Sequence, residues 1–83
     1  MPLFMDTHNN IDGLTAEAVV RAHESDLEVQ AKYGVNYIKG WFNEESGKVF
    51  CLVEAPDAET AAAVHREAHG LLADEITPVQ EFS

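Results

Sequence analysis

Residues 51–70, CLVEAPDAETAAAVHREAHG, constrain the fold more than any other stretch, because a strand and a helix must meet inside them. Cys51 to Ala55 is the apolar end of a strand. Pro56 prevents that strand from extending, and the Asp57 side chain can accept a hydrogen bond from the first free amides of a helix. Small apolar residues then recur at offsets of three and four until Gly70, which favours helix termination. We therefore expect a helix with a narrow apolar side that lies close to a sheet.

The rest of the chain predicts three further strands and one further helix. Together with the strand that ends at Ala55, the expected strands cover residues 3–8, 35–42, 48–55 and 76–82. Pro78 places the last strand at an edge, and Gly40 is expected to mark a bulge or a close backbone contact. The first helix is expected over residues 16–33, with Thr15 as its N-cap and Gly34 at its end. The order β-α-β-β-α-β with right-handed crossovers predicts a ferredoxin-like α+β fold, in which four antiparallel strands carry both helices on one face.

The distribution of apolar residues predicts a single domain over residues 1–83 that pairs with a second copy. The third expected strand is apolar on both faces, but the helices can cover only one face of the sheet. The other face must be buried by a partner, and the simplest partner is the same chain. We expect a homodimer of the dimeric α+β barrel type, with two sheets face to face. The apolar side of the first helix is expected to contain Ala16, Val20, His23, Leu27 and Ala31.

The charge balance restricts the partners of the protein. The chain has 15 acidic and 5 basic residues and a formal net charge of −10, so phosphate backbones and anionic membrane surfaces would be repelled. The longest apolar runs are far too short to span a bilayer, and the first residues lack the basic region and apolar core of a signal peptide. The single cysteine allows no internal disulfide, which is typical of a reducing compartment. We therefore expect a cytoplasmic protein that binds neither nucleic acid nor membranes.

His65 and His69 lie on one side of the second expected helix, because they are four residues apart, with roughly 6 Å between their Cβ atoms. Two imidazoles at this spacing can hold one metal ion. The glutamate that follows the first histidine in zinc peptidases is missing here, since Arg66 occupies that position. A histidine in the last turn of a helix also interacts favourably with free carbonyls and the helix dipole. By itself the pair therefore favours a structural role over metal binding.

The predicted topology brings further metal-ligating side chains to the same end of the sheet. His8 ends the first strand, Asp6 lies on the same face of that strand, and Cys51 lies in a neighbouring strand. His23 falls on the apolar side of the first helix, roughly two turns from its start. Three or more of these side chains could share a site with the histidines of the second helix. Imidazole, carboxylate and thiolate ligands suit zinc, nickel and copper better than magnesium or calcium.

Four segments carry a resemblance to a known family: MDTH at 5–8, AHESDLEVQAKYGV at 22–35, FCLVEAP at 50–56 and VHREAHG at 64–70. Nearly the whole chain resembles a family of small bacterial proteins, one member of which is described as a dimeric ferredoxin-like nickel-binding protein. The resemblance implies a nickel-binding homodimer with a role in nickel storage, buffering or sensing, and other divalent ions such as Zn²⁺ would suit the same ligands. The matching segments contain the first-choice ligands His8, Cys51, His65 and His69. The second choices are Asp6, His23 and Glu54.

Two other functions are open from the sequence. Two facing sheets could enclose a cavity for a small molecule, as in dimeric α+β barrel enzymes, with Tyr37, Trp41 and Phe50 as lining residues. An enzyme is not expected, because no clear acid–base pair accompanies a nucleophile and a lone cysteine in an apolar strand, Cys51, is more typical of packing. The remaining alternative is an interaction module without a ligand.

Overall fold

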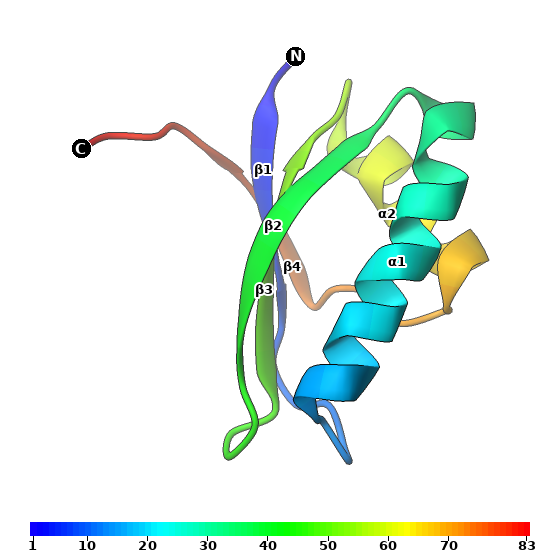
Figure 1. Ribbon diagram of the computed structural model, residues 1–83. Helices are drawn as coiled ribbons and strands as arrows, with labels where there is room; N and C mark the ends of the chain where they lie inside the picture. The colour runs from blue at the N-terminus through cyan, green and yellow to red at the C-terminus, as the bar shows by residue number, and fades with distance from the viewer.

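The computed structural model describes residues 1–83 and contains a four-stranded antiparallel sheet with both helices on one face (Figure 1). The elements are β1 (Leu3–His8), α1 (Ala16–Tyr33), β2 (Asn36–Asn43), β3 (Lys48–Glu54), α2 (Ala58–Ala68) and β4 (Glu75–Val79). The strand order is β2-β3-β1-β4, and each neighbouring pair is antiparallel. The predicted ferredoxin-like α+β fold is therefore confirmed. Neither α1 nor α2 combines the length and the apolar character that a membrane-spanning helix needs.

The helix ends form at the residues that the sequence predicts. The Thr15 side chain accepts a hydrogen bond from the Ala18 amide at 3.1 Å and begins α1, and Gly34 ends it in the left-handed region at φ 66°. The Asp57 side chain accepts from the Thr60 amide at 2.8 Å and begins α2. These local interactions satisfy amides that would otherwise lack partners and fix where each helix starts.

The buried side of α1 differs from the predicted apolar stripe. Ala16 and Ala31 are exposed, and Val20 and Leu27 are 56% and 44% exposed. The most buried residue of the helix is instead a carboxylate, Asp26, which is 2% exposed. The prediction was wrong for these four residues, because the side of α1 that faces the protein carries Asp26, which contacts His65 and His69 of the second helix region.

The helix-facing side of the sheet forms the core. Burial alternates along β1, so that Phe4, Asp6 and His8 are buried beneath the helices. Phe4 joins apolar side chains from the other elements in a core cluster of seven residues. The cluster consists of Phe4, Val35, Tyr37, Val53, Ala55, Ala61 and Val64. The polar residues Asp6 and His8 therefore extend the core toward one end of the sheet.

The central position of β3 and the edge position of β4 agree with the prediction, but some strand ends differ. β4 stops at Val79, and Phe82, which was expected in this strand, is 95% exposed. Gly40 makes the expected close contact, because a Cβ at this position would lie 2.5 Å from the carbonyl oxygen of Phe50. The irregularity in pairing lies slightly earlier, between Tyr37 and Lys39. The extra residue in β2 turns the remainder of this strand relative to β3.

Candidate metal centre

Two adjacent central strands supply three metal-ligating groups on the helix-facing side of the sheet. Asp6 and His8 of β1 are 0% and 5% exposed. The antiparallel register places Cys51 of β3 opposite Asp6, and this cysteine is half-buried. A carboxylate, an imidazole and a thiol therefore project from neighbouring positions toward the two helices.

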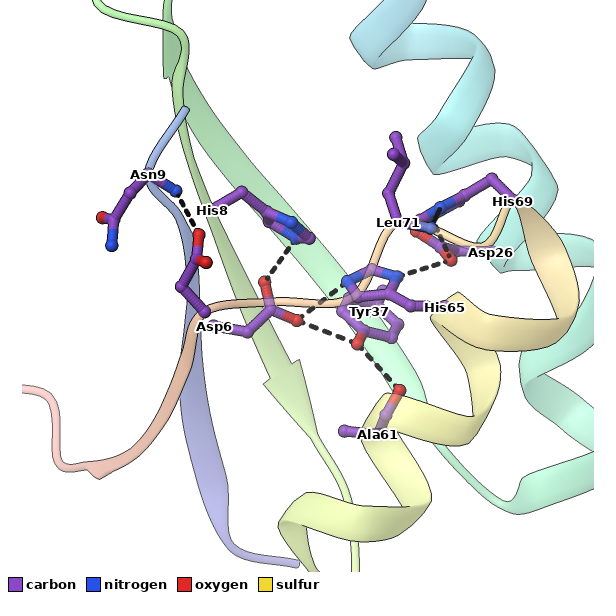
Figure 2. A network of polar contacts seen from close by, with 10 residues as sticks. Asp6, His8, Asn9, Asp26, Tyr37, Ala61, His65, His69 and Leu71 are labelled. Carbon is purple, nitrogen blue, oxygen red and sulfur yellow. Dashed lines mark hydrogen bonds and ion pairs between the residues drawn. The ribbon is translucent and has the colours of Figure 1, made fainter. Parts of the chain in front are cut away.

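His65 of α2 connects these strands to the helices (Figure 2). The side chain is 1% exposed, and both of its ring nitrogens have polar partners. Nδ1 lies 2.9 Å from Oδ1 of Asp26 on α1, and Nε2 lies 2.9 Å from Oδ2 of Asp6 on β1. One imidazole thus joins three elements that are distant in the sequence.

The two oxygens of the Asp6 carboxylate have different surroundings. Oδ2 accepts a hydrogen bond from the Tyr37 hydroxyl at 2.9 Å, in addition to its contact with His65. Oδ1 is buried, has no hydrogen-bond partner and lies 3.5 Å from Nε2 of His8. A buried oxygen without a donor costs free energy unless a donor or a cation compensates it. Oδ1 is therefore the atom of this cluster that most lacks a partner.

Two groups of side chains have donor atoms within 4.8 Å of one another. The first consists of Asp6, His8, Cys51 and His65, and the second of Asp26, His65 and His69. In the second group, Nδ1 of His69 accepts from the Leu71 amide at 3.1 Å, so Nε2 carries the proton and donates to Oδ1 of Asp26 at 3.1 Å. The polar atoms of the second group are thus already paired, whereas the first group contains the unpaired oxygen of Asp6. The first group, here called the four-residue cluster, fits a cation better.

Hydrogen bonds shift the titration of the buried groups against the effect of burial. Burial lowers the pKa of His65, but its hydrogen bonds with Asp26 and Asp6 outweigh burial and raise this pKa to about 11. Burial also lowers the pKa of His8, but its ion-pair contact with Asp6 at 3.5 Å and its contact with Cys51 raise this pKa to about 9. Burial raises the pKa of Asp6, but the hydrogen bond with His65 and the ion-pair contact with His8 hold it well below its usual value. Burial likewise raises the pKa of the Asp26 carboxyl, but its hydrogen bonds with His65 and His69 outweigh burial and lower this pKa. At neutral pH the cluster without metal therefore contains two protonated imidazoles between carboxylates.

Two residues predicted as ligands lie outside both groups of close donor atoms. Glu54 pairs with Leu3 at the opposite end of the sheet and accepts a hydrogen bond from Nδ2 of Asn36 at 3.0 Å. Strand alternation explains its position, because even-numbered residues of β3 face away from the helices. His23 lines a cavity between α1 and the sheet, close to the cluster but not within it.

Asp26 and the hydroxyl of Tyr37 also belong to this site, although neither was predicted from the sequence. Both side chains are 2% exposed and contact residues that were predicted as ligands. A signal for the aspartate was present, since it occupies one position in an otherwise apolar series at helical spacing. This series is Val19, Ala22, Asp26, Val29 and Tyr33.

The fold and the cluster together define a ferredoxin-like α+β protein with a buried set of donor groups suited to transition metals. The chain matches the model of a family described as "Nickel responsive protein SCO4226-like" over residues 4–79, and it belongs to that family. It is also similar to SCO4226 from Streptomyces coelicolor A3(2), known from a crystal structure, with 37% identity and a TM-score of 0.90 over 98% of this chain and 99% of that chain. No significant similarity to a curated protein was found. The family resemblance and the fold expected from the sequence are thus confirmed.

Proposed function

We propose that this protein binds Ni²⁺ without catalysing a reaction, and that the four-residue cluster holds the ion. The observation that carries this proposal is the buried Oδ1 atom of Asp6, which has no hydrogen-bond partner and lies beside the ring of His8. A divalent cation would compensate this oxygen and could be reached by two imidazoles and a thiol within the same 4.8 Å range. The family description, which refers to a response to nickel, supports the same metal.

The chemistry of the donor groups supports a late first-row metal. Imidazole nitrogens and a thiolate prefer nickel, copper or zinc, whereas magnesium and calcium prefer sites made entirely of oxygen. The cluster offers two imidazoles, one thiol and one carboxylate. Zn²⁺ is therefore a competing ion at the same ligands, and the proposal for nickel over zinc rests on the family description.

Residues around the cluster would hold its ligands in place. Asp26 is bonded to Nδ1 of His65 and so directs Nε2 toward the cluster, as carboxylates commonly do behind metal-binding histidines. Tyr37 donates its hydroxyl proton to Oδ2 of Asp6, and this leaves Oδ1 toward His8. Burial and then the Asp6 charge raise the pKa of Tyr37, so that the hydroxyl remains a donor at neutral pH. The ligand geometry is thus supported by hydrogen bonds that do not depend on the ion.

Binding must displace protons from the cluster, because a protonated imidazole cannot coordinate a metal. Exchange of protons for one divalent ion suits a protein that stores, buffers or senses nickel in proportion to its concentration, and we propose a role of this kind. A catalytic role is not part of the proposal.

Calorimetric titration of tag-free protein with Ni²⁺ tests the site. His8→Ala is expected to reduce the affinity at least tenfold, because it removes one ligand and leaves the His65 network in place. His23→Ala is the matched control, since His23 is a nearby half-buried histidine outside both donor groups. Circular dichroism should confirm that both variants are folded. If the folded His8→Ala variant binds Ni²⁺ as tightly as the wild type, the four-residue cluster is not the site.

A further inference from the structure

A cavity of about 360 Å³ lies between α1 and the sheet, next to the four-residue cluster. Its walls are mainly apolar and include Leu14, Val19, Ile38, Phe42 and Val49. Four polar side chains line its end next to the cluster, His8, Cys51, His65 and His69, and the other polar or charged lining residues are His23, Asp26 and Lys39. An apolar cavity with a few convergent polar groups is the usual form of a small-molecule site. It lies on the helix side of the sheet, so it is distinct from the space between two facing sheets considered from the sequence.

We propose that this cavity binds an uncharged, mainly aromatic small molecule of about two rings, with one hydrogen-bonding nitrogen or hydroxyl directed at His8 and Cys51. The proposal concerns the metal-free protein, because the head group would bond to two side chains that are also proposed as metal ligands. The size of the ligand, its lack of charge and the position of its polar atom each follow from a separate observation.

The volume sets the size of the ligand. An apolar cavity of roughly 150 Å³ is sufficient to hold benzene, and pockets for larger organic ligands start at roughly 300 Å³. The cavity here, at about 360 Å³, is more than twice the first of these volumes. It therefore accommodates two aromatic rings but is small for a nucleotide or another extended cofactor.

The charges around the cavity exclude ionic ligands. Lys39 and Asp26 are the only lysine, arginine, aspartate or glutamate side chains among the lining residues. The imidazoles of His8 and His65 also line the cavity, but they are already paired with the Asp6 and Asp26 carboxylates. Asp26 is already bonded to His65 and His69, so it is not free to pair with a cationic ligand. A single lysine on a chain with a net charge of −10 is a weak site for phosphates or carboxylates. Burial of a charged group in the apolar part of the cavity without a partner would be costly.

The hydrogen bonds at the inner end assign the position of the polar head group. His65 has partners at 2.9 Å on both ring nitrogens, and His69 has partners at 3.1 Å on both. The contact of His8 with Asp6 is longer, at 3.5 Å. Among the three imidazoles at the cluster end of the cavity, His8, with the neighbouring thiol of Cys51, therefore has most capacity to bond a further group.

Calorimetric titration combined with thermal unfolding offers a direct test, because neither readout depends on where a reporter side chain lies. Metal-free protein, prepared with a chelator, is titrated with 4-phenylimidazole near pH 8, where this probe is uncharged. The expected result is a saturable change in the heat of titration and a raised midpoint of thermal unfolding. Biphenyl-4-carboxylate, an anion of similar size, is expected to bind at least tenfold more weakly.

Replacement of either of two alanines on α1 by phenylalanine distinguishes binding in the cavity from binding elsewhere. Ala18 lines the cavity, so Ala18→Phe should fill part of it and weaken 4-phenylimidazole binding at least tenfold. Ala31 is exposed on the same helix and does not line the cavity, so Ala31→Phe should bind like the wild type. Both variants should retain their response to Ni²⁺, which separates this result from failure of the metal site. The proposal is overturned if the wild type gives no saturable change, if the folded Ala18→Phe variant binds as the wild type does, or if the anion binds as tightly as 4-phenylimidazole.

Discussion

Nδ1 of His65 lies 2.9 Å from Oδ1 of Asp26, and this contact joins the last turn of α2 to the middle of α1. Both side chains are almost fully buried, at 1% and 2% exposure. The contact fixes the ring so that Nε2 faces Asp6 on β1. A hydrogen bond behind a metal-binding histidine sets its orientation and raises its basicity. The position of α1 on the sheet and the proposed metal site thus depend on the same pair of residues.

The first prediction concerns this pair. Asp26→Asn should lower the affinity for Ni²⁺ by roughly tenfold to a hundredfold. The reason is that a neutral amide holds the His65 ring less strongly than a carboxylate does. Calorimetry measures the affinity, and Glu24→Gln, an exposed acidic residue on the same helix, is the control for the loss of one charge. Equal affinity in the two folded variants would show that Asp26 has no part in metal binding.

The second prediction is a stability optimum at mildly acidic pH for the metal-free protein. His65 has its pKa raised from 6.5 to about 11, so its stabilising effect is complete below about pH 6.5 and is lost as the pH rises toward 11. Asp6 has its pKa lowered from 3.8, so its stabilising effect is present above about pH 4 and is lost as the pH falls. The free energy of unfolding should therefore be highest between about pH 4 and pH 6.5.

Urea unfolding at several pH values measures this profile. Above pH 6.5, His65 alone contributes a decrease of up to about 1.4 kcal/mol per pH unit, and His8 adds to the decrease because its pKa is raised to about 9. His65→Gln should flatten the alkaline part of the curve, whereas His23→Gln should follow the wild type. A wild-type free energy of unfolding that stays constant from pH 6 to pH 9 would contradict the protonated state assigned to His65.

The third prediction is that Ni²⁺ binding releases at least two protons near neutral pH. The sequence alone suggests release of metal only below about pH 6, near the ordinary pKa of histidine. In the structure the pKa of His8 is raised to about 9 and that of His65 to about 11, so protons compete with the metal well above pH 7. The apparent affinity should therefore continue to rise through pH 8. Calorimetry in two buffers of different protonation enthalpy counts the protons, and an identical heat in both buffers would rule out this competition.

The path of the chain could be predicted from the sequence because its signals are local. Thr15 and Asp57 cap the helices through neighbours three residues away, and Gly34 adopts the left-handed backbone that ends α1. Pro78 marks the edge strand for an equally local reason, the loss of an amide donor. Such signals need no knowledge of the partners that a segment meets in the fold.

The candidate site could be predicted only in part, because its less obvious members depend on contacts across the fold. Asp6 and His8 follow from strand alternation, and His65 follows from its place at the end of α2. Asp26 did not follow, since a buried aspartate is stable only beside the histidines that α2 supplies. Glu54 was selected for its chemistry and its segment, although the register of β3 places it far from the other ligands.

The fourth prediction is that the protein forms a homodimer through the face of the sheet that the helices leave uncovered. Register pairs Met5 with Leu52 and Trp41 with Phe50 on this face, so apolar side chains lie side by side there. Leu52→Glu should shift the protein toward a monomer at micromolar concentration, because a buried carboxylate without a partner would oppose association. Val20→Glu, at an exposed position of α1, is the control. A single wild-type species near 9.1 kDa in sedimentation would contradict the dimer.

The final prediction concerns Cys51, which is half-buried and belongs to the four-residue cluster. Its modification by a charged thiol reagent should be slow in the metal-free protein, because the apolar walls of the cavity hinder an ionic reagent. Saturating Ni²⁺ should slow this modification at least tenfold further, since a coordinated thiolate is not free to react. Mg²⁺ is the matched control ion and should give no protection, because the cluster offers nitrogen and sulfur that this ion does not favour. Rapid modification of folded, metal-free protein would instead favour a reactive thiol, and equal rates with and without Ni²⁺ would remove Cys51 from the proposed ligands.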